Sequence, residues 1–138
     1  MAQIEIELPN DLMARIQAVE ENSREIIGDA VYAGGKIAED AIRIELREVL
    51  SSKHKNGTLI NALGTSTPKV DRNGVVNVKA GFSEDRPDGD SNGKIANILE
   101  YGSSRQPARP FLAPARRKSQ GRVENAIIKT FNEEVARL

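Results

Sequence analysis

The sequence predicts an α+β fold, in which a small antiparallel sheet packs against a long N-terminal helix and a C-terminal helix. Three observations support it. Residues 3–8 alternate between polar and apolar, residues 10–51 and 114–138 have helical periodicity, and an Asn-Gly pair separates two β-rich stretches within residues 65–82. The 138 residues, 38% of them apolar, suffice for one modest core. We therefore expect a single domain over residues 1–138.

The N-terminal elements follow from two different periodicities. A half-buried strand is expected over 3–8, with Pro9 ending it and Asn10 or Asp11 capping the next helix. Apolar residues then recur at steps of three or four, which predicts one amphipathic helix over 10–51. Its expected buried positions are Leu12, Ile16, Val19, Ile26, Val31, Ile37, Ala41, Leu46 and Val49, and its expected outer positions are Glu21, Glu25, Glu39 and Arg43.

Three glycines interrupt the predicted helix, at Gly28, Gly34 and Gly35. Each costs about 1 kcal/mol of helix stability relative to alanine. Two interpretations are open. The glycines allow close packing or a kink, or Gly34–Gly35 is a hinge that lets the N-terminal half swing when subunits assemble.

The sequence in the middle of the chain predicts a short helix followed by a hairpin. Thr58 can cap a helical stretch over 59–63 that ends at Gly64. The hairpin spans 65–82, with strands over 65–70 and 75–82. Its Asn73-Gly74 pair predicts a type I′ turn, which requires positive φ at both residues. Side chains of the second strand that share one face are Val76, Val78 and Ala80.

Residues 83–93 form a charged stretch without apolar side chains, so we expect a mobile surface loop. Residues 88–93 match the start of an EF-hand calcium loop. However, its twelfth position falls on Leu99 rather than on a carboxylate, and Pro87 prevents an entering helix. The sequence thus predicts a solvated turn rather than a calcium site.

The C-terminal third reads as two helices joined by a proline-stiffened link. A short helix is expected over 94–101, a connector over 102–113 and the last helix over 114–138. Gly102 suits a left-handed helix end, and three prolines at 107, 110 and 114 favour an extended crossing. Phe111 and Leu112 are expected to anchor the connector to the core. The expected buried stripe of the last helix is Val123, Ile127, Phe131, Val135 and Leu138.

Composition argues against most kinds of chemistry. The chain has no cysteine, which excludes disulfides, thiolate metal sites and a cysteine nucleophile. Its single histidine, His54, lies between two lysines and has no evident partner. No phosphate-binding glycine motif is present, so we expect no enzyme active site, no metal and no cofactor. No apolar run nears the roughly 20 residues of a membrane span, and the N-terminus is unlike a signal peptide, so neither a membrane partner nor export is expected.

The net charge of zero conceals an asymmetry along the chain. Residues 1–50 hold 11 acidic and 5 basic residues, and residues 101–138 hold 3 acidic and 8 basic ones. Either two oppositely charged helices pack against each other, or the acidic end of one copy meets the basic end of another. The basic cluster, here Arg105, Arg109, Arg116, Arg117, Lys118 and Arg122, could also contact phosphates. Without interleaved aromatics, such DNA contact would be transient and independent of sequence.

One segment resembles a known family. The stretch from Ile98 to Ala115 holds a Glu-Tyr-Gly triplet followed by Pro-Ala-Arg-Pro-Phe-Leu-Ala-Pro-Ala. This pattern resembles the neck, head–tail joining or minor tail-component (tail-completion) proteins of long-tailed bacteriophages. Residues 56–63 are similar to a second family element, from which they depart by placing Gly57 before Thr58 and alanine at 62. The candidate motif and interface residues are Glu100, Tyr101, Gly102, Pro107, Arg109, Pro110, Phe111, Leu112, Pro114 and Ala115.

The resemblance implies a non-enzymatic virion protein of the head–tail junction, assembled in the cytoplasm of a host bacterium. It implies a homo-oligomeric ring, often a hexamer, that docks between the head connector and the tail and encloses a lumen wide enough for DNA. We hypothesise that residues 83–93 and 65–74 make contacts on assembly, and that Glu100 pairs with Arg109 within or between subunits. Two alternatives stay open: a tail terminator that caps the tail tube, and a nucleic-acid-binding module of a prophage.

Overall fold

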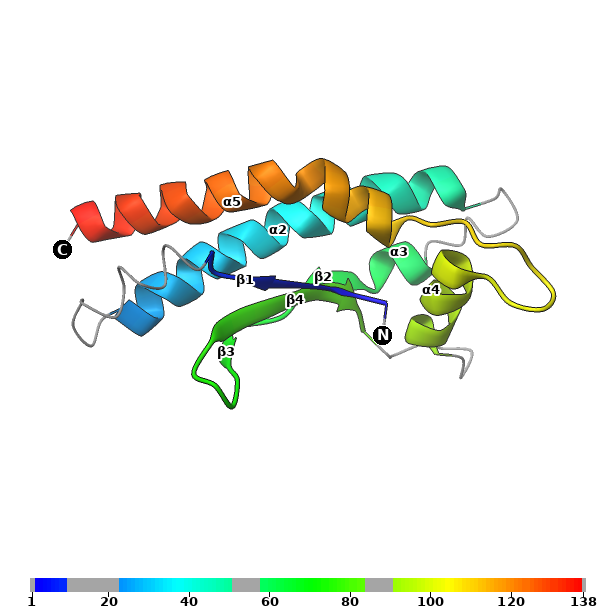
Figure 1. Cartoon of the computed structure of the whole chain (residues 1–138), viewed down its shortest axis with the longest axis horizontal. Helices are drawn as coiled ribbons and strands as arrows, with labels where there is room; N and C mark the ends of the chain where they lie inside the picture. Colours follow the sequence, from blue (N-terminus) through cyan, green and yellow to red (C-terminus); the bar gives the residue numbers. More distant parts are fainter. Residues whose placement is uncertain (1, 10–22, 51–57, 84–90, 138) are drawn as a thin grey trace.

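The computed structural model describes residues 2–9, 23–50, 58–83 and 91–137. Its elements in chain order are β1 (Ile4–Glu7), α2 (Ser23–Val49), α3 (Thr58–Asn61), β2 (Leu63–Thr65), β3 (Lys69–Val70), β4 (Val76–Phe82), α4 (Asn92–Tyr101) and α5 (Leu112–Ala136). The α+β class predicted from the sequence is confirmed. A small antiparallel sheet packs against α2, and α5 runs antiparallel along α2 (Figure 1).

Strand β4 is the centre of the sheet. It pairs with β1 on one side and with β2 and β3 on the other, always antiparallel. Val76, Val78 and Ala80 are all buried, so the face predicted for the second hairpin strand is correct. Since neighbouring side chains on a strand point to opposite faces, Asn77, Lys79 and Gly81 belong to the face turned away from α2.

Helix α2 is buried on two sides, and two of its glycines let neighbouring side chains approach its backbone closely. A Cβ on Gly34 would lie 2.8 Å from Cγ1 of Ile127 on α5, and one on Gly35 would lie 2.7 Å from Cγ2 of both Thr65 and Val78 in the sheet. Both distances are shorter than side chains tolerate. The helix continues without interruption through both positions, so of the two interpretations of these glycines the structure supports close packing.

Helical periodicity predicted the burial of two side chains incorrectly. Glu39, expected on the outer face of α2, is only 5% exposed, because β2 covers that side of the helix. Val135, expected in the buried stripe of α5, is 39% exposed. The rest of the described stripe, namely Val123, Ile127 and Phe131, is buried as predicted.

Several predicted boundaries shift. Leu63, predicted to be the last residue of the short helix, and Gly64, predicted to terminate it, both belong to β2. Helix α4 begins at Asn92, inside the stretch 83–93 that was predicted to be a loop. The connector ends at Phe111 rather than at residue 113, and α5 begins at Leu112. Residues 10–22, 51–57, 84–90 and 138, which include part of the predicted first helix and most of that loop, lie outside the described residues.

The hairpin forms, but its turn is not type I′. The N–H of Gly74 donates to the carbonyl of Asp71, and no non-glycine residue of the described chain has a positive φ. Asn73 is therefore not left-handed, whereas Gly74 is, with φ 79°. This is the pattern of a type I turn followed by a bulge glycine. The Asp71 carboxylate favours it by accepting from the N–H groups of Asn73 and Val75.

Candidate functional site

The segment that carries the family resemblance folds into a tightly bonded link between α4 and α5. Helix α4 ends where the N–H of Gly102 donates to the carbonyl of Ile98 at 2.8 Å. The link then turns back along α4, so that the N–H of Arg109 reaches the carbonyl of Leu99 at 2.6 Å. Within it, Ser103 and Gln106 exchange two backbone hydrogen bonds. Pro107 thus lies in a loop that closes back on α4, and Pro114 lies in the first turn of α5.

Gly102 is required at the point where the link leaves α4. Its φ of 78° is positive, as the sequence predicted, but its ψ of 179° places it in an extended region that essentially only glycine adopts, and not in the left-handed helical conformation expected. A Cβ there would also lie 2.8 Å from the backbone nitrogen of Ala108, which belongs to the part of the link that returns toward α4. Two independent reasons therefore favour glycine at this position.

The carboxylate of Glu100 holds the N-terminus of α5. One oxygen accepts from the N–H groups of Phe111 and Leu112 at 2.7 and 2.8 Å, and the other accepts from Ala113 at 3.0 Å. The next residue, Pro114, has no N–H, and the N–H of Ala115 bonds within the helix. A helix start normally leaves several N–H groups without partners, and here a buried anion from another helix satisfies them.

Phe111 anchors the same point to the core. Its side chain is fully buried and meets the ring of Phe82 edge-on, with the ring centroids 6.0 Å apart. Leu112 and Ala115 are buried beside it. The expectation that Phe111 and Leu112 anchor the connector is therefore correct.

The remaining motif residues are on the surface. Pro107, Arg109 and Pro110 are exposed, and Tyr101 is 74% exposed. No ion pair between Glu100 and Arg109 forms within the described chain: the guanidinium of Arg109 donates instead to the carbonyl of Val49, at 3.5 Å. Our hypothesis of that pair within one chain was wrong, because the backbone of α5 occupies both oxygens of Glu100.

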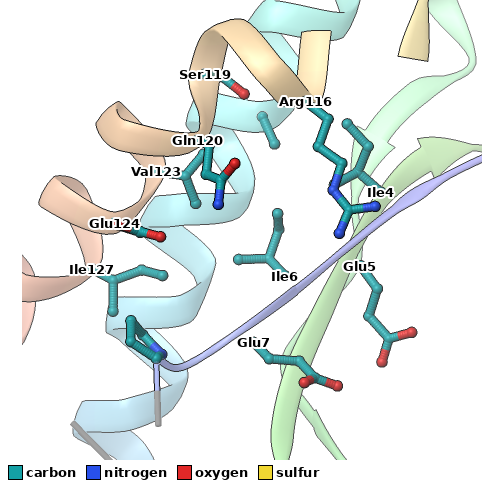
Figure 2. Close-up of a pocket in the computed structure, with 12 residues that line it drawn as sticks. Ile4, Glu5, Ile6, Glu7, Arg116, Ser119, Gln120, Val123, Glu124 and Ile127 are labelled. Carbon is teal, nitrogen blue, oxygen red and sulfur yellow. The ribbon is translucent and has the colours of Figure 1, made fainter. Parts of the chain in front are cut away.

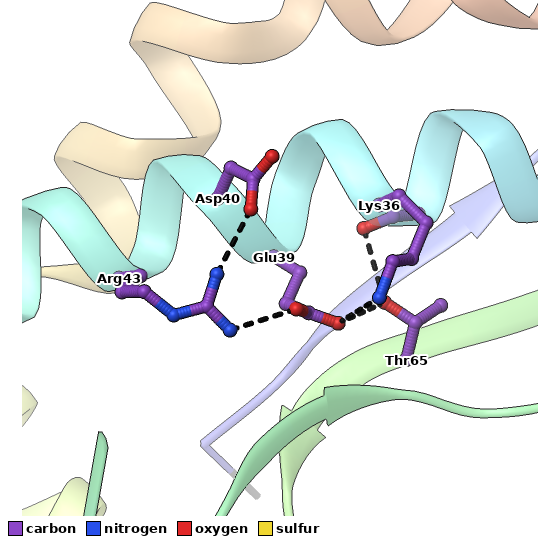
Figure 3. A network of polar contacts seen from close by, with 6 residues as sticks. Lys36, Glu39, Asp40, Arg43 and Thr65 are labelled. Atoms are coloured by element: carbon purple, nitrogen blue, oxygen red, sulfur yellow. Dashed lines mark hydrogen bonds and ion pairs between the residues drawn. The ribbon is translucent and has the colours of Figure 1, made fainter. Parts of the chain in front are cut away.

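A second polar network fixes α2 to the sheet. Glu39 accepts from Arg43 at 2.8 Å, from the hydroxyl of Thr65 at 2.9 Å and from Lys36 at 3.1 Å, and Arg43 also binds Asp40 (Figure 3). Burial by itself raises the pKa of the Glu39 carboxyl. The hydrogen bonds from Arg43, Lys36 and Thr65 outweigh burial, so its pKa lies below the ordinary value. This carboxylate is held ionised, which suits a structural role and not a proton-transfer role.

A shallow groove of about 160 Å³ lies between strand β1 and helix α5. The side chains of Ile4 and Ile6 face into it from the strand, and Val123 and Ile127 face it from the helix (Figure 2). The side chain of Arg116 extends from α5 toward the strand. Charged side chains from both elements also line the groove, namely Glu5, Glu7, Arg116 and Glu124.

The basic cluster lies along one end of α5 and on the link. All six of its side chains are exposed, but two have partners on α2: Lys118 binds the carboxylate of Glu45 at 2.7 Å, and Arg109 donates to the carbonyl of Val49 at 3.5 Å. The contact of Lys118 with Glu45 fits the interpretation in which oppositely charged helices pack against each other. The other interpretation concerns contacts between copies and stays a prediction.

Over the described ranges, no three side chains of His, Cys, Asp or Glu are grouped so as to hold a metal ion. Asn92, a position of the calcium-loop pattern, starts α4 and donates to the carbonyl of Ser83. Asp88 and Asp90 lie outside the described residues. In the part of the chain that the structure describes, no helix is long and apolar enough to cross a membrane.

Comparisons of the chain with known protein families, with curated proteins and with solved structures found no match. Sequence reasoning selected residues 98–115 as the candidate site but did not predict that Glu100 caps α5. A glutamate that caps a helix 12 residues downstream has no local sequence signal, since the usual cap lies next to its own helix. The only hint was the absence of Ser, Thr, Asp or Asn before Leu112.

Proposed function

We propose that this chain is a structural protein of the head–tail junction of a long-tailed bacteriophage, which acts by assembling into a ring between the head connector and the tail. The resemblance of residues 98–115 to that family is its starting point. The observation that carries the proposal is the Glu100 bridge, which joins α4 to α5 and so fixes the orientation of everything between them.

The Glu100 bridge separates the motif into residues that set the geometry of the link and residues that face solvent. Glu100, Gly102 and Phe111 are buried or tightly packed and set the geometry, while Tyr101 and the loop around Pro107 are presented to solvent. A rigid surface loop beside a basic helix is suited to protein contact, because little conformational entropy is lost when it binds. A protein that transmits position between two large assemblies requires such rigidity.

The experiment is a deletion of the gene from the phage or prophage that encodes it. We expect filled heads and tails of normal length that do not join, and joining restored in lysates by the purified chain. Overlong tails would favour the tail terminator instead. Normal particles would refute both virion roles.

The nucleic-acid alternative has its own measurement. A module that binds duplex DNA through the basic cluster would lose affinity steeply as salt rises, in proportion to the number of phosphates contacted. For a junction protein we expect only weak DNA binding in fluorescence anisotropy at physiological salt. Tight, salt-dependent binding to duplex DNA would support the prophage module.

A further inference from the structure

Two features of the surface are complementary and lie on different elements. One is the aromatic ring of Tyr101, at the end of α4. The other is a shallow hollow of about 380 Å³ on the face of the sheet that is turned away from α2. Residues around the hollow include Gln3, Gly64, Ser66, Lys79, Gly81 and Phe82.

Tyr101 is both exposed and rigidly held. Its 74% exposure is the highest of the exposed large hydrophobic side chains in the described chain. It stands between Glu100, which is bonded to α5, and Gly102, which is bonded to Ile98. A tyrosine held in this way can bury about 150–250 Å² on binding and loses little rotational freedom.

The hollow owes its shape to two glycines on adjacent strands. Gly64 of β2 and Gly81 of β4 are partners in the register of the sheet. Their neighbours Thr65 and Val78 point toward Gly35 of α2, so both glycines point the other way. A Cβ on Gly64 would meet no atom within 4 Å, whereas one on Gly81 would lie 2.9 Å from Cβ of Gln3, so the open part of the hollow lies over Gly64 and Gln3 borders it at Gly81. Glycine weakens a strand, and it often marks a place where another group approaches the backbone closely.

Charge on the two surfaces is also complementary. The link beside Tyr101 carries Arg105 and Arg109, both exposed and basic. Strand β1, on the edge of the sheet, carries Glu5 and Glu7 on the outer face. Their side chains are not buried, and a basic partner would relieve the repulsion between them.

We propose that Tyr101 of one copy inserts into the Gly64–Gly81 hollow of the next copy. The inference rests on the proposed ring and names its contact surfaces. The inserted side chain and the hollow lie at different places on each copy, so the contact is head-to-tail, and such contacts close into a ring when the rotation between copies permits. The ring of Tyr101 packs on the glycine backbone, Lys79 lies at its edge, and the link arginines approach β1.

Analytical ultracentrifugation of three variants of the full chain tests the contact. Tyr101→Ala removes the inserted ring, and Gly64→Val fills part of the hollow from a position where a Cβ meets no atom of its own copy within 4 Å. We expect each to weaken self-association by roughly 30-fold or more, as for a central interface residue. Tyr32→Ala, which removes the other tyrosine, is the control and should leave assembly unchanged. Circular dichroism and thermal unfolding would establish that each variant folds.

A cross-linking experiment locates the contact directly. Benzoylphenylalanine replaces Tyr101, and the labelled chain is mixed with an equal amount of ¹⁵N-labelled chain before irradiation. We expect mixed-isotope cross-links to peptides that contain Gly64 or Gly81. Cross-links between copies at other elements would overturn the proposal.

The outcomes of these experiments distinguish a failure of the proposed contact from a failure of the proposed function. If the wild-type chain assembles and neither Tyr101→Ala nor Gly64→Val weakens it, the contact is refuted. If the chain stays monomeric yet restores joining of heads to tails, the contact is refuted and the proposed function stands. If it assembles through this contact but does not restore joining, the function is refuted and the contact stands.

Discussion

Replacement of Glu100 by alanine tests whether the bridge between α4 and α5 holds the C-terminal part of the molecule together. The substitution removes the acceptor of three N–H groups. The N–H groups of Phe111 and Leu112 belong to buried residues and would lose their partner, whereas Ala113 is exposed and can bond to water.

The expected loss of stability follows from the two buried N–H groups and from the charge of the Glu100 carboxylate. Each buried N–H without an acceptor costs about 1–3 kcal/mol. Loss of an anion at the start of α5 costs about 0.3–1 kcal/mol more, and up to ~2 kcal/mol at a partly buried site. We therefore expect Glu100→Ala to lower the free energy of unfolding by about 2–8 kcal/mol. That is a large share of the roughly 5–15 kcal/mol that stabilises an ordinary domain.

Urea denaturation followed by circular dichroism is the assay, with the transition midpoint and slope fitted together. The matched control is Glu48→Ala, at an exposed position on α2, where we expect a change below about 0.5 kcal/mol. Glu100→Gln keeps the shape but turns its NH₂ group toward one of the N–H donors, so we expect an intermediate loss. If Glu100→Ala were no more destabilising than Glu48→Ala, the bridge would not be a structural element.

Three further predictions concern packing, backbone and pH, each measured by thermal or urea unfolding. Gly34→Ala should destabilise by about 1–3 kcal/mol through overpacking against α5, whereas Gly121→Ala, whose Cβ meets no atom within 4 Å, should stabilise by up to about 1 kcal/mol; equal effects would refute the packing role of Gly34. Gly102→Ala should cost about 1–3 kcal/mol because of both its φ and its contact with Ala108, and an unchanged midpoint would contradict this. The pKa of Glu39 is lowered on folding, so its contribution to stability is present above the unfolded pKa of about 4.3 and is lost as the pH falls through the folded value. Glu39→Gln should therefore destabilise the protein by about 1–3 kcal/mol at pH 7 and by much less near pH 3, and a difference that does not depend on pH would argue against the charge.

Hydrophobic periodicity correctly predicted the elements that bury only one of their faces. The alternation of Ile4 and Ile6 identified β1, and the spacing of Val123, Ile127 and Phe131 identified the buried side of α5. Periodicity failed at Glu39, because α2 packs on the sheet as well as on α5 and so has a wider buried surface than one stripe. It failed at Val135 for the opposite reason, since that end of α5 is less covered.

The candidate site also combines features that the sequence predicted with features that it could not predict. Sequence alone selected the segment from Ile98 to Ala115, a positive φ at Gly102, the anchors Phe111 and Leu112, and a helix that begins close to Pro114. Those features depend on the intrinsic geometry of glycine and proline and on the burial of large apolar groups, which are local properties. The buried acceptor role of Glu100 and the hollow above Gly64 and Gly81 depend on groups that are distant in sequence. Only the tertiary structure could decide them, because hydrogen-bond partners and packing space are set by how the elements meet.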